Sequence, residues 1–439
     1  MTPSRQGKRA GFAVLLAALS LAGSAEAQRS PALGGLPDLA TDAVGRVAGD
    51  VRGDLGQVTQ GLDGEVRDLA SARLDGLQAL VRANPRALEL DAHGQAVVRG
   101  QVLAVDPSPE ALDRAIKAGF GVLRRTTLDP LGLQVVTLSP PPGMAARDGL
   151  RRLRRLDPGG QYDLDHLYSP SGAPPAPTGV AATETAAPPA SAAVGLLDTG
   201  VDAAHPALAG DVVAQKAFAP GGVAPAAHGT AVASLIAGRG EGMRGAAPGA
   251  RLYAADVYGS GPTGGSADAI LGALAWMAET RVRVVNISLV GPANLTVQAA
   301  VRALLARGVL IVAPVGNDGP AAPPLYPASY PGVIAVTAVD ARGRVLPEAG
   351  HALHVDFAAP GADVLAARPG GGLVKLRGTS FAAPIVSGEL AVLTASAGGG
   401  AGANAVARLV ASARPARGDR WLGHGVVGDD LALAGSGPR

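Results

Sequence analysis

Short apolar segments alternate with helical patterns through the second half of the chain, from residue 192 onward. This alternation predicts a parallel α/β sheet, because parallel strands are joined by crossovers that are usually helices. We therefore expect one large α/β domain over residues 191–435. The expected strands are Val194–Leu197, Val282–Leu289, Val309–Ala313 and Val333–Val339, and the expected helices are Ala227–Gly238, Ala267–Glu279 and Leu295–Ala306.

Four polar residues stand at the ends of these elements: Asp198 and Asn317 follow strands, while His228 and Ser380 open helices. Sites in such sheets gather at the carboxyl ends of strands. Serine hydrolysis needs a serine to attack, a histidine to take and return its proton, and an aspartate to orient the imidazolium. Asn317 would donate a side-chain N–H to the oxyanion, beside the backbone N–H of Ser380 at its helix start.

Each of these residues also has a purely structural explanation. Ser380 or Thr379 would cap a helix, Asp198 and Asn317 suit turns, and His228 suits a core in which its nitrogens are satisfied. Four coincidences of this kind are harder to accept than one, so the catalytic interpretation is favoured.

The chain from residue 192 to 395 resembles the subtilisin-like serine proteases, the subtilase family, and residues 423–429 are similar to that family's closing segment. The Asp–His–Ser order along the chain is the order in subtilisin. The matching stretches are Leu197-Asp198-Thr199-Gly200-Val201, His228-Gly229-Thr230-Ala231-Val232-Ala233, Asn286-Ile287-Ser288-Leu289, Gly316-Asn317 and Gly378-Thr379-Ser380-Phe381-Ala382-Ala383-Pro384.

The resemblance implies a catalytic triad of Asp198, His228 and Ser380, with Asn317 as the oxyanion donor. It implies that Ser288, Leu289 and Val290 form an edge that pairs with the substrate backbone, so proteins or peptides are the expected substrates. No organic cofactor is implied. The departures bear chiefly on specificity: Phe381 stands where methionine is more usual, and Val290 intervenes before Gly291.

Members of the family often bind calcium, but no Asp-rich ligand loop is found in this sequence. Asp202 and Asp318 are expected to be turn residues. His351 and His354 have a spacing that suggests a metal, but a pair without a third ligand is usually part of a loop. We therefore expect no metal ligands among them.

The region before the large domain has a different pattern, strand, helix, strand, strand, helix, strand, which predicts a small α+β unit over residues 96–168. By resemblance it is a ferredoxin-like pro-domain that inhibits the enzyme until it is removed. The expected elements are Val97–Val105, Pro109–Lys117, Gly121–Thr127, Gly132–Leu138, Met144–Leu156 and Gln161–Leu167.

Three further segments complete the expected organisation. Residues 1–27 have a basic start, an apolar run and Ala25-Glu26-Ala27, which is typical of a cleavable secretory signal. Residues 28–95 form an amphipathic, partly helical arm, with one apolar stripe over 43–82 that is weakened by glycines. Residues 169–190 are rich in Pro, Ala and Thr and are expected to be an exposed linker.

Composition narrows the partners and the compartment. The formal net charge is only +2 and no long basic block is present, so nucleic acid is not an expected partner. The sequence contains 0 cysteines, and no later segment reads as transmembrane. We expect an extracytoplasmic protein, periplasmic or secreted. Two alternatives remain: a catalytically degenerate envelope binding or scaffolding protein, and an esterase or amidase.

Overall fold

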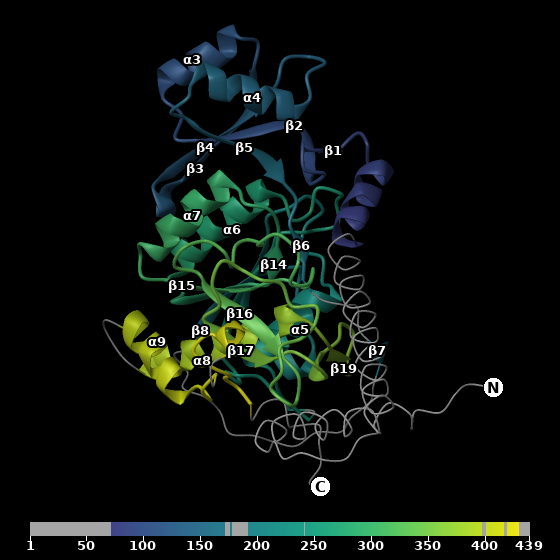
Figure 1. The fold of residues 1–439 in the computed structure, drawn as a ribbon, viewed down its shortest axis with the longest axis vertical. Coiled ribbons are helices and arrows are strands. Elements are labelled where there is room, and N and C mark those ends of the chain that lie inside the picture. The colour runs from purple at the N-terminus through teal and green to yellow at the C-terminus, as the bar shows by residue number, and fades with distance from the viewer. Residues whose placement is uncertain are drawn as a thin grey trace, which may run out of the picture. The chain divides into compact units, whose positions relative to one another are not determined.

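The computed structural model describes residues 72–171, 176–177, 192–240, 242–396, 401–416 and 419–429. The expected signal peptide and most of the expected arm lie outside these residues. Figure 1 shows the described chain as helices and strands. No helix in the described ranges has both the length and the hydropathy that a membrane span requires.

A seven-stranded sheet of parallel strands forms the centre of the large domain, in the order β17-β16-β15-β13-β8-β12-β9. The expected parallel α/β architecture is therefore confirmed. The strands are β8 (Ala193–Asp198), β9 (Val212–Ala217), β12 (Arg251–Asp256), β13 (Val284–Ile287), β15 (Leu310–Pro314), β16 (Ile334–Val339) and β17 (Phe357–Pro360).

Helices cover both faces of this sheet. One layer contains α6 and α7, and the other contains α8, which packs against α5 and α9 and against five of the strands. α8 and the strands other than β9 are mostly buried, which accounts for their largely apolar sequences. The helices are α5 (Ala227–Ala237), α6 (Ala267–Thr280), α7 (Leu295–Leu305), α8 (Ala383–Ser396) and α9 (Ala401–Ser412).

One expected strand is wrong in its extent. Residues 282–289 do not form a single strand, because β13 ends at Ile287 and a separate two-residue strand, β14 (Leu289–Val290), leaves the central sheet. The intervening Ser288 is buried, and its hydroxyl donates to the carbonyl oxygen of Ser380 at 3.2 Å. An apolar run does not reveal such a break, because the partner of Ser288 lies 92 residues further along the chain.

A smaller antiparallel sheet precedes the large domain, with β5 and β4 on either side of β2 and β3 beyond β4. This order, β5-β2-β4-β3, together with two helices, is the expected ferredoxin-like arrangement. The elements are β2 (Ala96–Val105), α3 (Pro109–Lys117), β3 (Gly121–Leu128), β4 (Leu133–Ser139), α4 (Ala146–Leu156) and β5 (Gln161–His166).

The end of the expected arm contributes structure to the small sheet. Residues 72–83 are helical, and β1 (Leu88–Leu90) pairs with the start of β2. Leu77 of the helix and Leu88 pack into one small apolar cluster with Leu167. Arm and small sheet are therefore continuous in this part of the chain, and we refer to residues 72–83 as the arm helix.

Side chains of β5 meet the helix starts of the large domain. Asp163 accepts a hydrogen bond from the backbone N–H of Leu295 at 2.8 Å, and Asp165 accepts one from the N–H of Asp268 at 2.9 Å. Carboxylates at these positions satisfy free N–H groups and complement the helix dipoles of α7 and α6. The small sheet is thus held on the helix layer by polar contacts of defined geometry.

Candidate active site

Asp198 is the last residue of β8, in the middle of the large sheet, and its side chain is fully buried. His228 lies in the first turn of α5, and its Nδ1 is 2.8 Å from Oδ1 and 2.9 Å from Oδ2 of Asp198. A Cβ on Gly229 would lie 2.2 Å from the carbonyl oxygen of Thr199, so glycine is needed for α5 to approach this closely. The two residues are thus brought together as expected.

The electrostatics of His228 follow from this pairing. Burial of the ring opposes protonation, but the Asp198 carboxylate and the backbone of Ser171 outweigh it and raise the pKa of His228 above its ordinary value of 6.5. Its Nε2 is buried and makes no well-formed hydrogen bond among the described residues, although the backbone of Ser171 lies near enough to favour the protonated ring. Buried nitrogens are normally satisfied, so an unsatisfied one on a paired imidazole is the arrangement of a base awaiting a proton.

Ser380 lies in a short 3-10 turn, η3 (Thr379–Phe381), which contacts α5. Its Oγ is buried and lies 3.5 Å from the carbonyl oxygen of Ser288. The ring of the next residue, Phe381, lies 5.4 Å from the imidazole of His228, measured between centroids. The regular helix begins only at Ala383, later than the sequence suggests, because the chain first turns at Gly378, where φ is 140°.

Asn317 is oriented by the same turn. Its Oδ1 accepts a hydrogen bond from the backbone N–H of Thr379 at 2.9 Å, which directs Nδ2 towards Ser171, whose Oγ it meets at 2.7 Å. The hydroxyl of Thr379 accepts from the N–H of Gly316 and also lies 3.4 Å from Ser171 Oγ. Thr379 is fully buried. The sequence suggested Thr379 only as a possible helix cap. Its position next to Ser380 in the motif could have indicated a role in positioning Asn317.

The expected substrate-binding edge is occupied by the protein's own chain. Leu289 and Val290 of β14 pair antiparallel with Pro170 and Ser169 of β6 (Ser169–Pro170). Ser288, the third expected residue of this edge, instead points into the protein, where it contacts Ser380.

At the start of the expected exposed linker, Ser169 is half-buried and Pro170 is exposed, whereas Ser171 is only 4% exposed. Beyond the gap in the described residues, β7 (Ala176–Pro177) pairs with β19 (Leu373–Leu376), the strand that leads to Gly378. The Pro-rich composition could not predict this, because the bonding partners lie more than a hundred residues away.

The other residues weighed as metal ligands have structural roles. Asp202 accepts backbone N–H bonds from Ala204 and Gly370, as a turn residue does. His351 stacks on Trp421 with ring centroids 3.5 Å apart, and His354 Nε2 lies 2.8 Å from a carbonyl oxygen. In the described ranges no three His, Asp or Glu side chains gather where they could hold a metal ion.

Asp318 differs from its expected role. It is not a simple turn residue but forms an ion pair with Arg73 of the arm helix, with 2.5 Å between Asp318 Oδ2 and Arg73 Nε. The side chains are 14% (Arg73) and 11% (Asp318) exposed. A contact across 245 residues leaves no trace in a single sequence.

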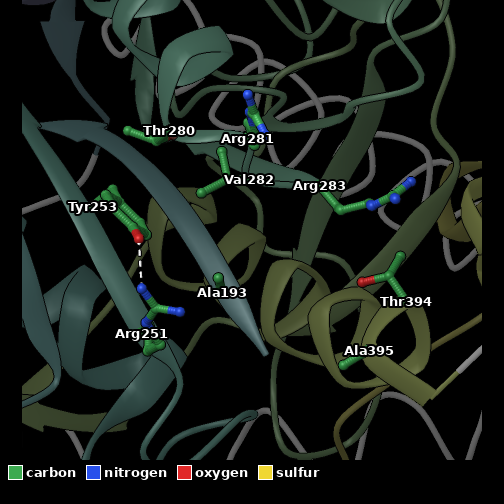
Figure 2. A pocket seen from close by; sticks show the side chains of 9 residues that line it. All are labelled: Ala193, Arg251, Tyr253, Thr280, Arg281, Val282, Arg283, Thr394 and Ala395. Atoms are coloured by element: carbon green, nitrogen blue, oxygen red, sulfur yellow. Dashed lines mark hydrogen bonds between the residues drawn. The ribbon is translucent and has the colours of Figure 1, made fainter. Parts of the chain in front are cut away.

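A separate hollow of about 270 Å³ lies away from these residues, and Figure 2 shows the side chains that line it. It includes Ala193 and Arg251, which begin β8 and β12, and Arg283, which precedes β13. Asp198 is at the other end of β8. This arginine-lined hollow is therefore at the amino ends of the strands and takes no part in the candidate site.

Comparison with known proteins agrees with this geometry. The family model described as the Subtilase family matches residues 190–425, which are more than half of the chain. The chain belongs to the subtilase family. Residues 190–425 thus form a subtilisin-like serine protease domain, and the alternative of a catalytically degenerate binding protein is not favoured.

The relatives of this subtilase differ in how much of their own length this chain covers. Subtilisin Savinase of Lederbergia lenta is 36% identical over 206 residues, which are 46% of this chain and 75% of the relative. The alkaline protease of Alkalihalobacillus alcalophilus is also 36% identical over 206 residues, but this chain spans only 53% of it. Fervidolysin from Fervidobacterium pennivorans, a keratinolytic enzyme related to subtilisin, has the same fold, with a TM-score of 0.64 and 24% identity over 80% of this chain and 63% of its own.

Proposed function

We propose that this subtilase is an exported serine endopeptidase that uses Asp198, His228 and Ser380 as its catalytic triad and Asn317 as an oxyanion donor. The observation that carries the proposal is the buried pair of His228 and Asp198, whose imidazole keeps Nε2 unpartnered in the part of the structure described. The element that holds Ser380 contacts the helix that holds His228. No organic cofactor is needed for this chemistry.

The proposed reaction begins at Ser380 Oγ, which in this structure donates to the carbonyl oxygen of Ser288 and not to His228 Nε2. Ser380 Oγ attacks the carbonyl carbon of a peptide bond while its proton passes to His228 Nε2, and the Asp198 carboxylate stabilises the imidazolium. The N–H groups of Asn317 and Ser380 would bind the oxyanion. The C–N bond then breaks as the imidazolium gives its proton to the leaving amine. Water activated by the same imidazole hydrolyses the acyl-enzyme and restores Ser380.

Peptides are the favoured substrates because β14 offers a strand edge. β14 pairs with the extended segment Ser169–Pro170 as one strand pairs with another. Proteins that recognise peptides by strand addition bind an extended peptide backbone in the same way. An ester or a small amide would use less of this edge. A natural substrate would lie along β14 where β6 lies now.

The same pairing supports maturation by self-cleavage. The chain approaches the site as β6, contacts Asn317 and Thr379 with Ser171, and pairs on the far side of the site as β7. We expect the cut between Ser171 and Ala176. Residues 96–168 would then be a pro-domain that stays docked through Asp163 and Asp165, and residues 1–27 would be the signal that exports the precursor.

A serine-directed phosphonate probe tests the proposed nucleophile. The probe, added to the purified protein, is expected to label a single peptide that contains Ser380, as identified by mass spectrometry. Ser380→Ala should abolish the label. Ser396→Ala, which removes an exposed hydroxyl at the far end of α8, should keep it. Labelling that persists in Ser380→Ala would overturn the assignment.

Replacing Asn317 by alanine is expected to lower kcat by about 10²–10³-fold with little change in KM, because the oxyanion donor acts mainly in the transition state. That range was itself measured on a subtilisin, so it carries the family's value to this chain. Steady-state kinetics on one quenched peptide measure the effect. Because Asn317 also accepts from Thr379, the melting temperature is measured alongside. A KM effect alone would count against the oxyanion role.

The pH dependence of activity is set by His228, which must be neutral to accept the proton of Ser380. Since its pKa is raised above 6.5, the protonated and inactive form persists to higher pH than for a free histidine. We expect kcat/KM to rise with pH through a midpoint above 6.5, and to fall about tenfold per pH unit well below it. A pH–rate profile measures the midpoint. A midpoint at or below 6.5 would contradict the paired geometry.

A further inference from the structure

Ser171, which follows β6, lies among the groups of the candidate site. Its hydroxyl oxygen accepts a hydrogen bond from Nδ2 of Asn317 at 2.7 Å and lies 3.4 Å from the hydroxyl oxygen of Thr379. Its backbone lies near enough to His228 to help raise the pKa of that ring. Ser171 is almost fully buried, so water does not compete freely for these contacts. The chain is therefore held in the site by this side chain as well as by the strand pairing of β6.

The side-chain amide of Asn317 is fixed in orientation by its other end. Its Oδ1 accepts a hydrogen bond from the backbone N–H of Thr379 at 2.9 Å, so turning the amide over would break that bond. The one acceptor that Nδ2 meets in the described ranges is the hydroxyl of Ser171. The group assigned to the oxyanion is therefore engaged, before any reaction, by a neutral oxygen of the chain that is to be cut.

The nucleophile and the base are not yet aligned for attack. Ser380 Oγ donates to the carbonyl oxygen of Ser288 at 3.5 Å, and His228 Nε2 makes no well-formed hydrogen bond in the part of the chain described. Attack requires that Ser380 turn to His228. It also requires that Nδ2 of Asn317 leave the Ser171 hydroxyl and bind the oxyanion. A hydrogen bond that is made in the ground state and lost before the transition state raises the barrier.

Lack of space does not force this contact on Ser171. The residue borders a cavity of about 550 Å³, so its small side chain has open space beside it. The hydroxyl nevertheless faces Asn317, which indicates that the hydrogen bond sets its orientation. One more methyl group at this position would also find space in the cavity.

Building on the proposed function, on which the inference rests, we propose that the Ser171 hydroxyl slows self-cleavage by holding Nδ2 of Asn317 away from the oxyanion in the uncut chain. We call this hydrogen bond the Ser171 lock. The strand pairing of β6 places the chain on the substrate edge, whereas the lock withholds one donor from the reaction. A hydroxyl at the same position of any substrate therefore strengthens binding in the ground state and slows the cut.

Removal of the hydroxyl tests the lock in the precursor. The full precursor is unfolded in urea and diluted, fluorescence of Trp276 and Trp421 reports refolding, and intact mass follows the cut after refolding is complete. Ser171→Ala should be cut about two- to tenfold faster than the parent, which corresponds to one hydrogen bond. Ser396→Ala, which removes an exposed hydroxyl at the far end of α8, should be cut at the parent rate. A rate for Ser171→Ala at or below that of the parent would overturn the lock.

A matched pair of variants separates the hydroxyl from the size of the side chain. Threonine and valine are both branched at Cβ and have nearly the same shape, but only threonine can accept the hydrogen bond of Asn317. Ser171→Val should therefore be cut about two- to tenfold faster than Ser171→Thr. Circular dichroism confirms that both precursors are folded. Equal rates for the two would show that only the size of the side chain matters, and the lock would be rejected.

Removal of Asn317 provides the control that a simple preference for alanine would not pass, because the lock acts only through Asn317. In an Asn317→Ala precursor, which is cut more slowly, Ser171→Ala should change the rate by less than about twofold. Equal gains in the two backgrounds would refute the lock. If no precursor is cut, the parent included, the proposed protease function fails, and that result is distinct from cutting at equal rates.

Peptides supplied to the processed enzyme give a second measurement that does not depend on refolding. Two quenched peptides differ only in serine or alanine at the residue that takes the place of Ser171 on the substrate edge. The serine peptide should have the lower KM and the lower kcat, with kcat/KM nearly equal, because the lock stabilises the bound ground state and not the transition state. A kcat for the serine peptide equal to or above that of the alanine peptide would contradict the lock.

Discussion

Replacing Ser380 by alanine is expected to leave the precursor uncut and to lower peptide hydrolysis by about a millionfold. The reason is that alanine lacks the hydroxyl that forms the acyl-enzyme in the proposed mechanism. The magnitude comes from subtilisin, a member of the same family, and is therefore a transfer rather than an independent estimate. Intact mass and N-terminal sequencing of the exported protein measure the processing, and a quenched peptide measures the turnover.

The two chains should differ at a defined place. The parent chain is expected to begin between residues 172 and 176, whereas Ser380→Ala should begin near Gln28 and retain the pro-region. The same short N-terminus in both would show that another protease cuts the linker. The same long N-terminus in both would contradict self-cleavage and would imply an enzyme that works with its pro-region attached.

Replacing Asp198 by asparagine is expected to lower kcat by about 10⁴-fold while the fold is kept. Asparagine cannot hold the Nδ1–H of His228 in the same way, because it presents an amide where a carboxylate now accepts at 2.8 Å. The imidazole would lose both its orientation and the charge that raises its pKa, so Nε2 would no longer be placed as a base. The backbone N–H of Thr199 could still bond to the remaining side-chain oxygen.

Steady-state kinetics and a pH–rate profile measure this variant together. The acid midpoint should fall as kcat falls, which a merely structural defect would not produce. Asp202→Asn is the matched control: this aspartate lies four residues further on, and its carboxylate accepts from the backbone N–H groups of Ala204 and Gly370. Equal losses in the two variants would count against the triad role of Asp198.

The large domain could be predicted because its elements follow local rules. Buried strands such as β8 and β15 are continuous apolar runs; β8 ends in Asp198, β15 is followed three residues later by Asn317, and their carboxyl ends meet at one edge of a parallel sheet. Three strands of this sheet were not predicted from the sequence: β17 is apolar but only four residues long, and β9 and β12 have mixed composition. β9 is half-exposed and carries Lys216, and β12 begins with Arg251.

The contacts around the site depended on partners that are far apart in the chain. The pairing of β6 with β14 joins residues about 120 positions apart. Proline is depleted in strands, so the local sequence around Pro170 does not indicate that a strand forms there. The pair of Arg73 and Asp318 and the hydrogen bond of Asn317 to Ser171 are of the same kind. The motif residues identified the chemistry of the candidate site. Only the folded chain could show which of its own segments occupies that site.

The position of β6 on the substrate edge also bears on when the enzyme becomes available to other proteins. A tethered strand competes at an effective concentration of about millimolar, whatever the concentration of the protein itself. To displace β6, a peptide in solution must have a higher ratio of concentration to dissociation constant than the tethered strand has. Once the tether is cut, the same competition becomes bimolecular. Blockade then weakens with dilution, so transfer of the protein to a larger volume would by itself favour release of the active enzyme.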